Sequence, residues 1–303
     1  MKHFTLIIGL LASLSVWSEE VKFSSIITGY SSGALESTIV ENGSWFNVRY
    51  PVHQAIYIKH PKGDLLFDTG LGRQTAGALQ QQSWLDRQLF AISEVQGVKD
   101  QLEQQGMSID QIKAIIPSHL HWDHTGGLPD LLGIPVWAQQ AGIDFALNEG
   151  TEPGFLKAHL VDEILWQPLV LETQSYMGFA KSLDIYKDGT LVLVGLEGHT
   201  PGQVGLFINL NNGQRYFFIG DTTWTLTGVM ENLPRPAITQ WLLNIDQNLE
   251  KNNAQVQKIH DLKQQYPELI IVPAHDQFVA KTLPHFPDFN IPTDFTIPEN
   301  KGS

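Results

Sequence analysis

Cysteine is absent from all 303 residues of the chain. Without cysteine there is no disulfide framework, no thiol nucleophile, no lipid-anchored cysteine and no thiolate ligand for a metal. Any metal site must therefore be built from histidine and carboxylate side chains.

Basic residues are also scarce, because 19 Lys and Arg are outnumbered by 32 Asp and Glu and leave a formal net charge of −13. No cluster of Lys or Arg interrupts this excess of negative charge along the chain. A surface of this sign repels a phosphate backbone. We therefore expect no nucleic acid partner.

A long apolar run occurs only at the N-terminus, where Lys2 precedes a stretch from Phe4 to Val16, with Ser18 and Glu19 after it. This layout is typical of a secretory signal peptide, and the stretch is too short for a membrane span of about 20 residues. We expect cleavage near Ser18, a periplasmic or secreted protein, and no stable membrane span in the mature chain. An N-terminal anchor or a buried helix is the alternative interpretation.

The rest of the chain has the composition of a globular protein and contains no low-complexity tract. Its length fits one large domain. We therefore expect a signal peptide at residues 1–18, one domain at 19–285 and a C-terminal tail at 286–303.

The pattern of apolar residues predicts a β-rich, helical, β-rich, helical order along the chain. The two helical regions are 75–105 and 237–266. We expect 75–98 to form either a lid or a dimer contact, so a homodimer is one of the two alternatives. Strands are expected at 22–28, 54–60, 64–68, 109–116 and 269–272, with hairpins at 183–196 and 204–219.

Two segments of the first half are echoed in the second half. Asp64–Thr69 resembles Tyr216–Thr222, and Ile115–His119 resembles Ile271–His275. These echoes predict a duplicated β-rich and helical unit, whose two copies pack sheet against sheet in a four-layer αββα sandwich of the α/β class. Chance similarity of short apolar segments is the alternative.

One segment, Ser118–Gly127, carries four candidate metal ligands within six residues. His119 and His121 point to the same side of an extended chain, and a turn brings Asp123 and His124 to the adjacent space. So many titratable groups crowded together are costly without a cation, so this cluster indicates a metal site. Three further candidates each follow a strand-like run: His199, Asp221 and His275.

Together these residues resemble the metallo-β-lactamase superfamily, whose HxHxDH motif, downstream His, bridging Asp and final His occur here in the same order. The resemblance implies that His119, His121 and His199 hold one metal ion. It implies that Asp123, His124 and His275 hold a second, with Asp221 bridging the two. Asp123 and Asp221 are then the expected catalytic residues. Asp68, at the end of an early strand, is expected to orient one of the metal-binding side chains by a hydrogen bond without binding metal itself.

Two divalent ions at such a site lower the pKa of a shared water, so that a metal-bridging hydroxide attacks a carbonyl that the ions polarise. Ligands of nitrogen and oxygen without sulfur suit Zn²⁺ first, and iron, manganese or cobalt remain open. We therefore expect a metal-dependent hydrolase of a small ester or lactone.

Within the superfamily, the segments around Pro51, Asp68, His119–His124 and His199 look most like the N-acyl homoserine lactonases, the enzymes of quorum quenching. Those lactonases place a tyrosine shortly after the bridging aspartate, whereas Trp224 stands here and cannot supply a phenolic proton. A β-lactamase-like amidase, a phosphotriesterase, another esterase of the same fold and a non-catalytic metal-binding protein are the alternative functions.

Four aromatic residues are candidates for an apolar substrate pocket: Trp122, Trp224, Phe90 and Phe179. Ordinary core packing is the alternative for each of them. Five histidines lie outside the motif, and we interpret them as structural or solvent-exposed: His53, His60, His159, His260 and His285.

Overall fold

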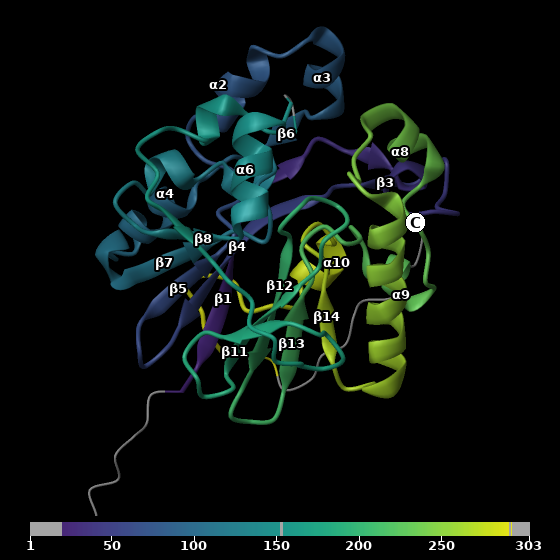
Figure 1. Cartoon of the computed structure of the whole chain (residues 1–303). Coiled ribbons are helices and arrows are strands. Elements are labelled where there is room, and N and C mark those ends of the chain that lie inside the picture. Colours follow the sequence, from purple (N-terminus) through teal and green to yellow (C-terminus); the bar gives the residue numbers. More distant parts are fainter. Residues whose placement is uncertain (1–19, 152–153, 291, 293–303) are drawn as a thin grey trace, which may run out of the picture.

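Two β-sheets packed face to face, with helices on their outer sides, form the body of the protein in a computed structural model that describes residues 20–151, 154–290 and 292 (Figure 1). The four-layer α/β architecture expected from the sequence is confirmed. The expected signal peptide and most of the expected tail lie outside the described residues.

The first sheet is mixed and contains seven strands. Its centre pairs β4 antiparallel with β5, and β5 parallel with β7, so that Leu66 lies opposite both Tyr57 and Ile115. In spatial order the strands are β6 (Ile92–Ser93), β1 (Lys22–Ser31), β4 (Val52–Lys59), β5 (Asp64–Phe67), β7 (Ile112–Ile116), β8 (Val136–Ala138) and β9 (Trp166–Pro168).

The second sheet has five strands and contains both expected hairpins. Its last two strands pair in parallel, with Phe217 opposite Ile271. The parallel pairs β5–β7 and β13–β14 are the segments that echo each other in the sequence, which supports the predicted duplication. The strands are β10 (Ser182–Asp184), β11 (Leu191–Gly195), β12 (Val204–Asn209), β13 (Arg215–Phe218) and β14 (Ile270–Val272), and a separate pair is formed by β2 (Ala34–Leu35) and β3 (Val48–Arg49).

Three apolar layers hold the sandwich together. The central layer joins the facing sides of both sheets, with Phe23 of β1 packed edge to face on Tyr216 of β13 at 4.8 Å between ring centroids. Outside the first sheet, Leu102 of α4 packs over Leu66; outside the second, Ile259 of α9 packs over Phe217. Burial of these side chains is the main stabilising contribution to the fold, at about 25 cal/mol per Å² of apolar area.

The helices are mostly short and lie on the outer sides or at one end of the sandwich (Figure 1). The helical region expected at 75–105 divides into three helices and a short strand, and the one expected at 237–266 divides into two helices. Asn244 adopts a left-handed conformation with φ 45° and ends α8, and α9 starts afresh at its N-cap Asn248. The α-helices of the described part of the chain are α1 (Glu36–Ile39), α2 (Thr75–Gln80), α3 (Trp84–Leu89), α4 (Val98–Gln104), α5 (Trp122–Thr125), α6 (Gln140–Asn148), α7 (Leu226–Met230), α8 (Ala237–Leu243), α9 (Leu249–Gln265) and α10 (Gln277–Ala280).

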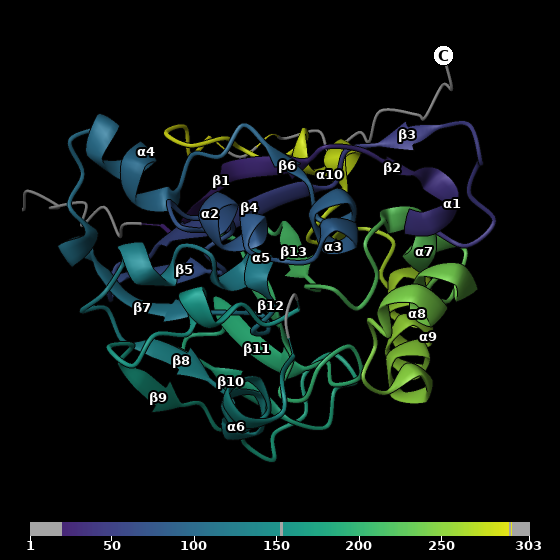
Figure 2. The same cartoon turned by 90° about the horizontal axis from the view of Figure 1, so that it is seen from above.

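The directions of the strands bring the ends of several of them to one edge of the sandwich. β5, β7, β11, β13 and β14 all finish there, and β4 begins there because it runs antiparallel to β5. Loops at such an edge carry side chains from distant parts of the sequence. Helices α1, α3 and α8 surround the same edge (Figure 2). None of the described helices is long and apolar enough to cross a bilayer.

Candidate metal centre

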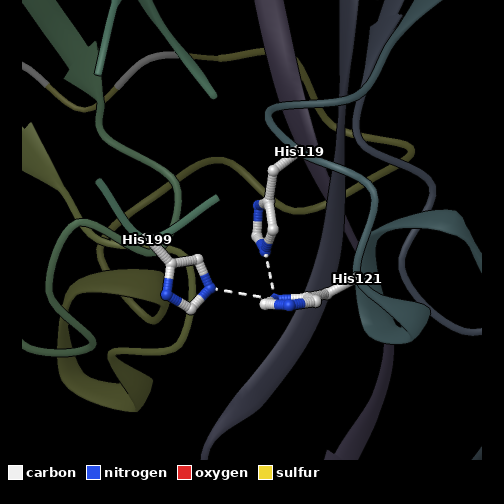
Figure 3. Close-up of side chains that lie close together, drawn as sticks. All are labelled: His119, His121 and His199. Carbon is white, nitrogen blue, oxygen red and sulfur yellow. Dashed lines mark hydrogen bonds between the residues drawn. The ribbon is translucent and has the colours of Figure 1, made fainter. Parts of the chain in front are cut away.

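Three imidazole rings meet at the first of two metal positions (Figure 3). His119 and His121 come from the loop after β7, and His199 comes from the loop after β11. His121 Nδ1 lies 3.0 Å from His119 Nε2 and 2.9 Å from His199 Nε2. Two donors bonded to one zinc ion at about 2.0–2.1 Å are about 3.0–3.4 Å apart, so these separations suit a shared ion.

The outward nitrogens of these rings are held by neighbouring polar groups. His119 Nδ1 lies 3.1 Å from Ser118 Oγ, and His199 Nδ1 lies 2.8 Å from Asp246 Oδ1. Asp246 is buried and is bonded in turn by the Arg235 guanidinium, at 3.0 Å to the same oxygen. Such outer partners fix the orientation of a metal-binding imidazole. Sequence reasoning missed Arg235 and Asp246, because neither belongs to a motif and they lie on either side of α8, in or next to a region expected only to be helical.

The second metal position is formed by Asp123, His124 and His275, with Asp221 beside them. His275 Nε2 lies 3.2 Å from Asp123 Oδ2 and 3.0 Å from Asp221 Oδ1. His124 Nε2 lies 3.3 Å from Asp221 Oδ1 and 3.9 Å from Asp123 Oδ1. The Val52 carbonyl lies 2.8 Å from His275 Nδ1, where it can accept a hydrogen bond that orients this ring.

Asp221 lies between the two positions. Its Oδ1 faces His124 and His275, whereas its Oδ2 lies 3.6 Å from His199 Nε2 of the first position. Oδ2 also lies 3.2 Å from His275 Nε2, so the carboxylate faces both groups, mainly the second. The structure thus brings all seven residues that the sequence suggested as ligands to one place. His119, His121 and His199 form one group as the resemblance implied, whereas His124 groups with His119 and Asp221, and Asp123 and His275 group with His53; their role as ligands stays a prediction.

Asp68 holds the metal-binding loop from the outside, as expected. Its backbone is in the left-handed region with φ 59°, which aspartate tolerates better than most residues. Its carboxylate accepts the Ser118 amide at 2.6 Å and lies 2.9 Å from His124 Nδ1. Both contacts orient the loop that carries the HxHxDH motif.

The pKa of a histidine is lowered at the first metal position and raised at the second. Burial and the neighbouring imidazoles lower the pKa of His121 to about 3, so this ring is a free electron-pair donor at neutral pH. Burial alone would lower the pKa of His124, but the carboxylates of Asp68, Asp123 and Asp221 together raise it well above its ordinary value. The second position thus attracts positive charge, which a divalent ion supplies when it displaces the proton.

The chemistry of the donors fits two bound divalent ions. His124 Nε2 and Asp221 Oδ1 are buried and form no aligned hydrogen bond, although such groups rarely stay unpaired in a protein interior. Both atoms point at the space between the ligands. Nitrogen and carboxylate oxygen without sulfur match zinc and other first-row divalent metals.

The interpretation of His53 as a residue outside the site is wrong. His53 is only 3% exposed, and its Nδ1 lies 3.3 Å from Asp123 Oδ2. With Asp123 and His275 it forms a third group of nearby potential ligand atoms. The signal that would have found it is its place at the start of β4, because an antiparallel strand begins at the edge where its neighbours end.

Three of the other histidines have structural partners, as expected. The ring of His60 stacks on Tyr186 at 4.0 Å between centroids, and His260 Nδ1 lies 2.9 Å from the Val229 carbonyl. His159 lies under the metal-binding loop, with its Nδ1 3.1 Å from the Trp122 carbonyl. The fourth, His285, is exposed.

A cavity of about 460 Å³ opens beside the two positions. Phe90, Trp122 and Trp224 line it, as expected. The expectation for Phe179 is wrong. Its ring packs in the apolar layer under α9, with its centroid 5.6 Å from that of Phe217, and is buried there instead of lining the cavity. Other apolar lining comes from Ile39 of α1, Leu89 of α3, Ile238 and Leu242 of α8, and from Phe145 and Phe155.

Trp224 stands directly over the bridging carboxylate. Its indole Nε1–H donates to Asp221 Oδ2 at 2.8 Å, and the Arg235 guanidinium lies 4.3 Å from its ring centroid. This cation–π contact fixes the ring from behind. The indole edge is therefore held at the floor of the cavity, beside the metal positions.

A double sheet with helices outside and seven His and Asp ligands at one edge defines a class of metal-binding hydrolase folds. A model of the metallo-beta-lactamase superfamily matches residues 51–275, and the chain belongs to this superfamily.

Among curated relatives, the chain is similar to N-acyl homoserine lactonase AttM of Rhizobium radiobacter, with 26% identity over 197 residues, 61% of this chain and 69% of the relative. It is also similar to N-acyl homoserine lactonase AiiB of Agrobacterium fabrum, with 27% identity over 184 residues, 57% of this chain and 63% of the relative.

Solved structures of similar fold carry the same kind of name. An N-acyl homoserine lactone hydrolase with the product N-hexanoyl-L-homoserine at its catalytic metal centre superposes with a TM-score of 0.69, covering 90% of this chain and 99% of that one at 17% identity. AidC, a dizinc quorum-quenching lactonase, superposes with a TM-score of 0.56, covering 85% and 88% at 18% identity. At these sequence identities, the structural similarity shows the shared fold alone.

Proposed function

We propose that this protein is a dinuclear zinc hydrolase that opens the lactone ring of N-acyl homoserine lactones, and so inactivates diffusible acyl lactones in the manner called quorum quenching. The observation that carries the proposal is the lining of the cavity, which joins His121, Asp123, Asp221 and His275 of the candidate metal site to apolar side chains of α1, α3 and α8. An acyl homoserine lactone has a polar ring at one end and an apolar chain at the other, so it matches this division.

Bound at the floor, two divalent ions would activate a water near neutral pH and polarise the lactone carbonyl. The residues of the chain then have separate tasks. Asp68 and Asp246 hold the imidazoles in place through their outward nitrogens. The closely packed rings of Trp122 and Phe90, 6.0 Å apart between centroids, form part of the wall that restricts bulk water at the site.

The ring-opening step requires a proton at the leaving alkoxide. Water adds across the C–O bond, so the acyl carbon gains a hydroxyl group and the ring oxygen gains a proton. Trp224 can donate a hydrogen bond but cannot give up its indole proton, whereas the Asp123 carboxylate lines the cavity and can carry one. We assign the proton transfer to Asp123, and to the Trp224 N–H the positioning of the Asp221 carboxylate to which it donates.

Export of the protein is part of the proposal. Its support is the sequence of the first 18 residues, with Lys2 before an apolar stretch and Ser18 after it. We expect fractionated cells of the source organism to hold the protein in the periplasm or the medium, shortened by about 18 residues in an intact-mass measurement. A full-length protein in the cytoplasm would contradict export and leave the hydrolase proposal untouched.

The experiment that tests the substrate compares initial rates of zinc-loaded protein on four compounds: N-hexanoyl homoserine lactone, a cephalosporin, a phosphotriester and a simple aryl ester. We expect kcat/KM for the lactone near or above about 10⁴ M⁻¹s⁻¹ and well above the other three. A faster rate on another compound would reassign the substrate, and no turnover of any of them would indicate a metal-binding protein without catalysis.

A further inference from the structure

His53 occupies a place where a strand of a sandwich usually carries an apolar side chain. It is the second residue of β4, and its neighbours Val52 and Ala55 are buried apolar residues. Its ring lies among other rings of the site, 5.2 Å from His275 and 5.5 Å from Trp122 between centroids. A buried imidazole is costly unless both of its nitrogens have polar partners.

Both nitrogens of His53 face polar atoms. Nε2 lies 3.1 Å from Ser31 Oγ, which comes from β1, the neighbour of β4 in the sheet. Nδ1 lies 3.3 Å from Asp123 Oδ2, although the two are not aligned as a hydrogen bond in this structure. The backbone is also fixed, because Thr28 Oγ1 donates to the His53 carbonyl at 2.9 Å.

Only one arrangement of protons suits these partners. A neutral imidazole has one donor and one acceptor nitrogen, and an ionised carboxylate can only accept. The Nδ1–H must therefore point to Asp123, and Nε2 must accept the hydroxyl proton of Ser31. The carboxylate thus selects the Nδ1–H tautomer of His53, and the Ser31 hydroxyl supports it by donating to Nε2.

The Asp123 carboxylate lies between His53 and the rest of the second metal position. Its Oδ1 faces His124 Nε2 at 3.9 Å, and its Oδ2 faces His53 Nδ1 at 3.3 Å and His275 Nε2 at 3.2 Å. Asp221, the carboxylate shared between the positions, is not a member of the group that His53 forms with Asp123 and His275. The ring therefore contacts Asp123 at Oδ2, the oxygen that His275 also faces, and can hold that oxygen in place.

We propose that Ser31 and His53 form a positioning relay that orients Asp123 and thereby sets the affinity of the second metal position alone. The inference rests on the proposed pair of metal ions, but not on the lactone substrate. It assigns two strand residues of the first sheet, far from the metal-binding motif in sequence, to the control of one ion.

Competitive titration of metal-free protein with Zn²⁺ against a chelating indicator tests the relay. In His53→Phe we expect the second zinc equivalent to bind roughly 10- to 100-fold more weakly, the range for losing an outer partner, with the first unchanged. Ser31→Ala should show a smaller loss in the same equivalent. His53→Asn should restore most of the affinity, because its side-chain amide can donate from near the place of Nδ1.

His285→Phe is the matched control, since this exposed histidine lies outside the site and its variant should bind both equivalents like the wild type. Melting temperatures of the metal-free variants separate orientation from folding. Unchanged affinity for the second equivalent in His53→Phe would overturn the relay, and so would an equal loss of both equivalents with a lower melting temperature. Failure of His53→Asn to recover affinity would instead make His53 a direct ligand. None of these readings depends on turnover of a lactone.

Discussion

At the scale of single residues, the two metal positions depend on Asp221 in common. Its carboxylate lies 3.0 Å from His275 Nε2 of the second group and 3.6 Å from His199 Nε2 of the first, so it faces both groups. In Asp221→Ala we expect both zinc equivalents to bind more weakly, by more than the roughly 10- to 100-fold typical of losing an outer partner. Elemental analysis after dialysis measures this, with Asp144→Ala on the exposed face of α6 as control. Two equivalents retained in Asp221→Ala would refute the bridge.

In the proposed mechanism, Trp224 acts in the reaction and is not a metal ligand. In Trp224→Phe the ring still packs under Arg235, but the hydrogen bond from Nε1 is lost. We expect zinc content to stay at the wild-type value and kcat/KM for the lactone to fall roughly 10- to 100-fold, the cost of a hydrogen bond to a charged group. Steady-state kinetics on metal-loaded protein checks this, and an unchanged kcat/KM would remove Trp224 from the mechanism.

The residues of the site differ in how far the sequence could reveal them. Seven were predictable because a dense run of His and Asp has few structural uses, and three single residues each followed a strand. His53 was not, because a lone histidine in an apolar strand is usually structural. Phe179 and Phe90 looked alike in the sequence, since periodicity does not say which side of a sheet an aromatic ring will pack against.

At the scale of elements, the buried carboxylate of Glu36 holds together the segment that contains β2, α1 and β3. Glu36 Oε1 accepts the Arg49 Nε–H at 2.7 Å, and Oε2 accepts the Ser44 amide at 3.1 Å and the Asn47 side-chain amide at 3.2 Å. Burial alone would raise the pKa of Glu36, but these partners outweigh it and lower the pKa. The segment matters for function because Thr38 and Ile39 line the cavity.

Glu36→Gln should lower the free energy of unfolding of the metal-free protein by about 1–3 kcal/mol at pH 7. Because the pKa of Glu36 is lowered in the folded state, its contribution is complete above the unfolded pKa of about 4.3 and is lost as the pH falls through the folded value. The difference between wild type and variant should therefore shrink at pH values below about 4. Urea unfolding of wild type and variant at pH 7 and at a pH below about 4 measures this difference. A difference that does not change with pH would contradict a lowered pKa of Glu36 in the folded protein.

Strands were easier to predict than helix ends. Hairpins such as β12–β13 carry Asn-Gly or Asp-Gly turns, which are strong local signals. The interruption between α8 and α9 has no such signal. It lies between Asn244, which ends α8, and Asn248, which caps α9, and Asp246 between them reaches His199.

At the scale of the whole molecule, each metal position takes ligands from both halves of the duplicated fold. His119 and His121 belong to the first half and His199 to the second; Asp123 and His124 belong to the first and His275 to the second. Metal held by these residues would therefore connect the two sheets. This relation could be anticipated from the sequence echo, since repeated units that pack face to face bring equivalent loops to one edge.

Removal of metal should accordingly destabilise the folded protein. A ligand at a thousandfold excess over its Kd stabilises the native state by about 4 kcal/mol, which for a domain of this size corresponds to roughly 10 °C in Tm. We expect the Tm to fall by at least this much in excess chelator and to recover on adding zinc but not magnesium. Calorimetry measures it, and equal Tm values with and without zinc would show that the two halves do not share an ion.

The most direct test of a lactonase with two cooperating ions is the initial rate of N-hexanoyl homoserine lactone hydrolysis while metal-free protein is titrated with zinc. We predict that the rate stays low through the first equivalent, rises with the second and reaches a plateau at two equivalents per chain, because the polarised carbonyl and the activated water need both positions. A rate that is independent of zinc, or that never rises above the uncatalysed reaction, would contradict a two-ion lactonase.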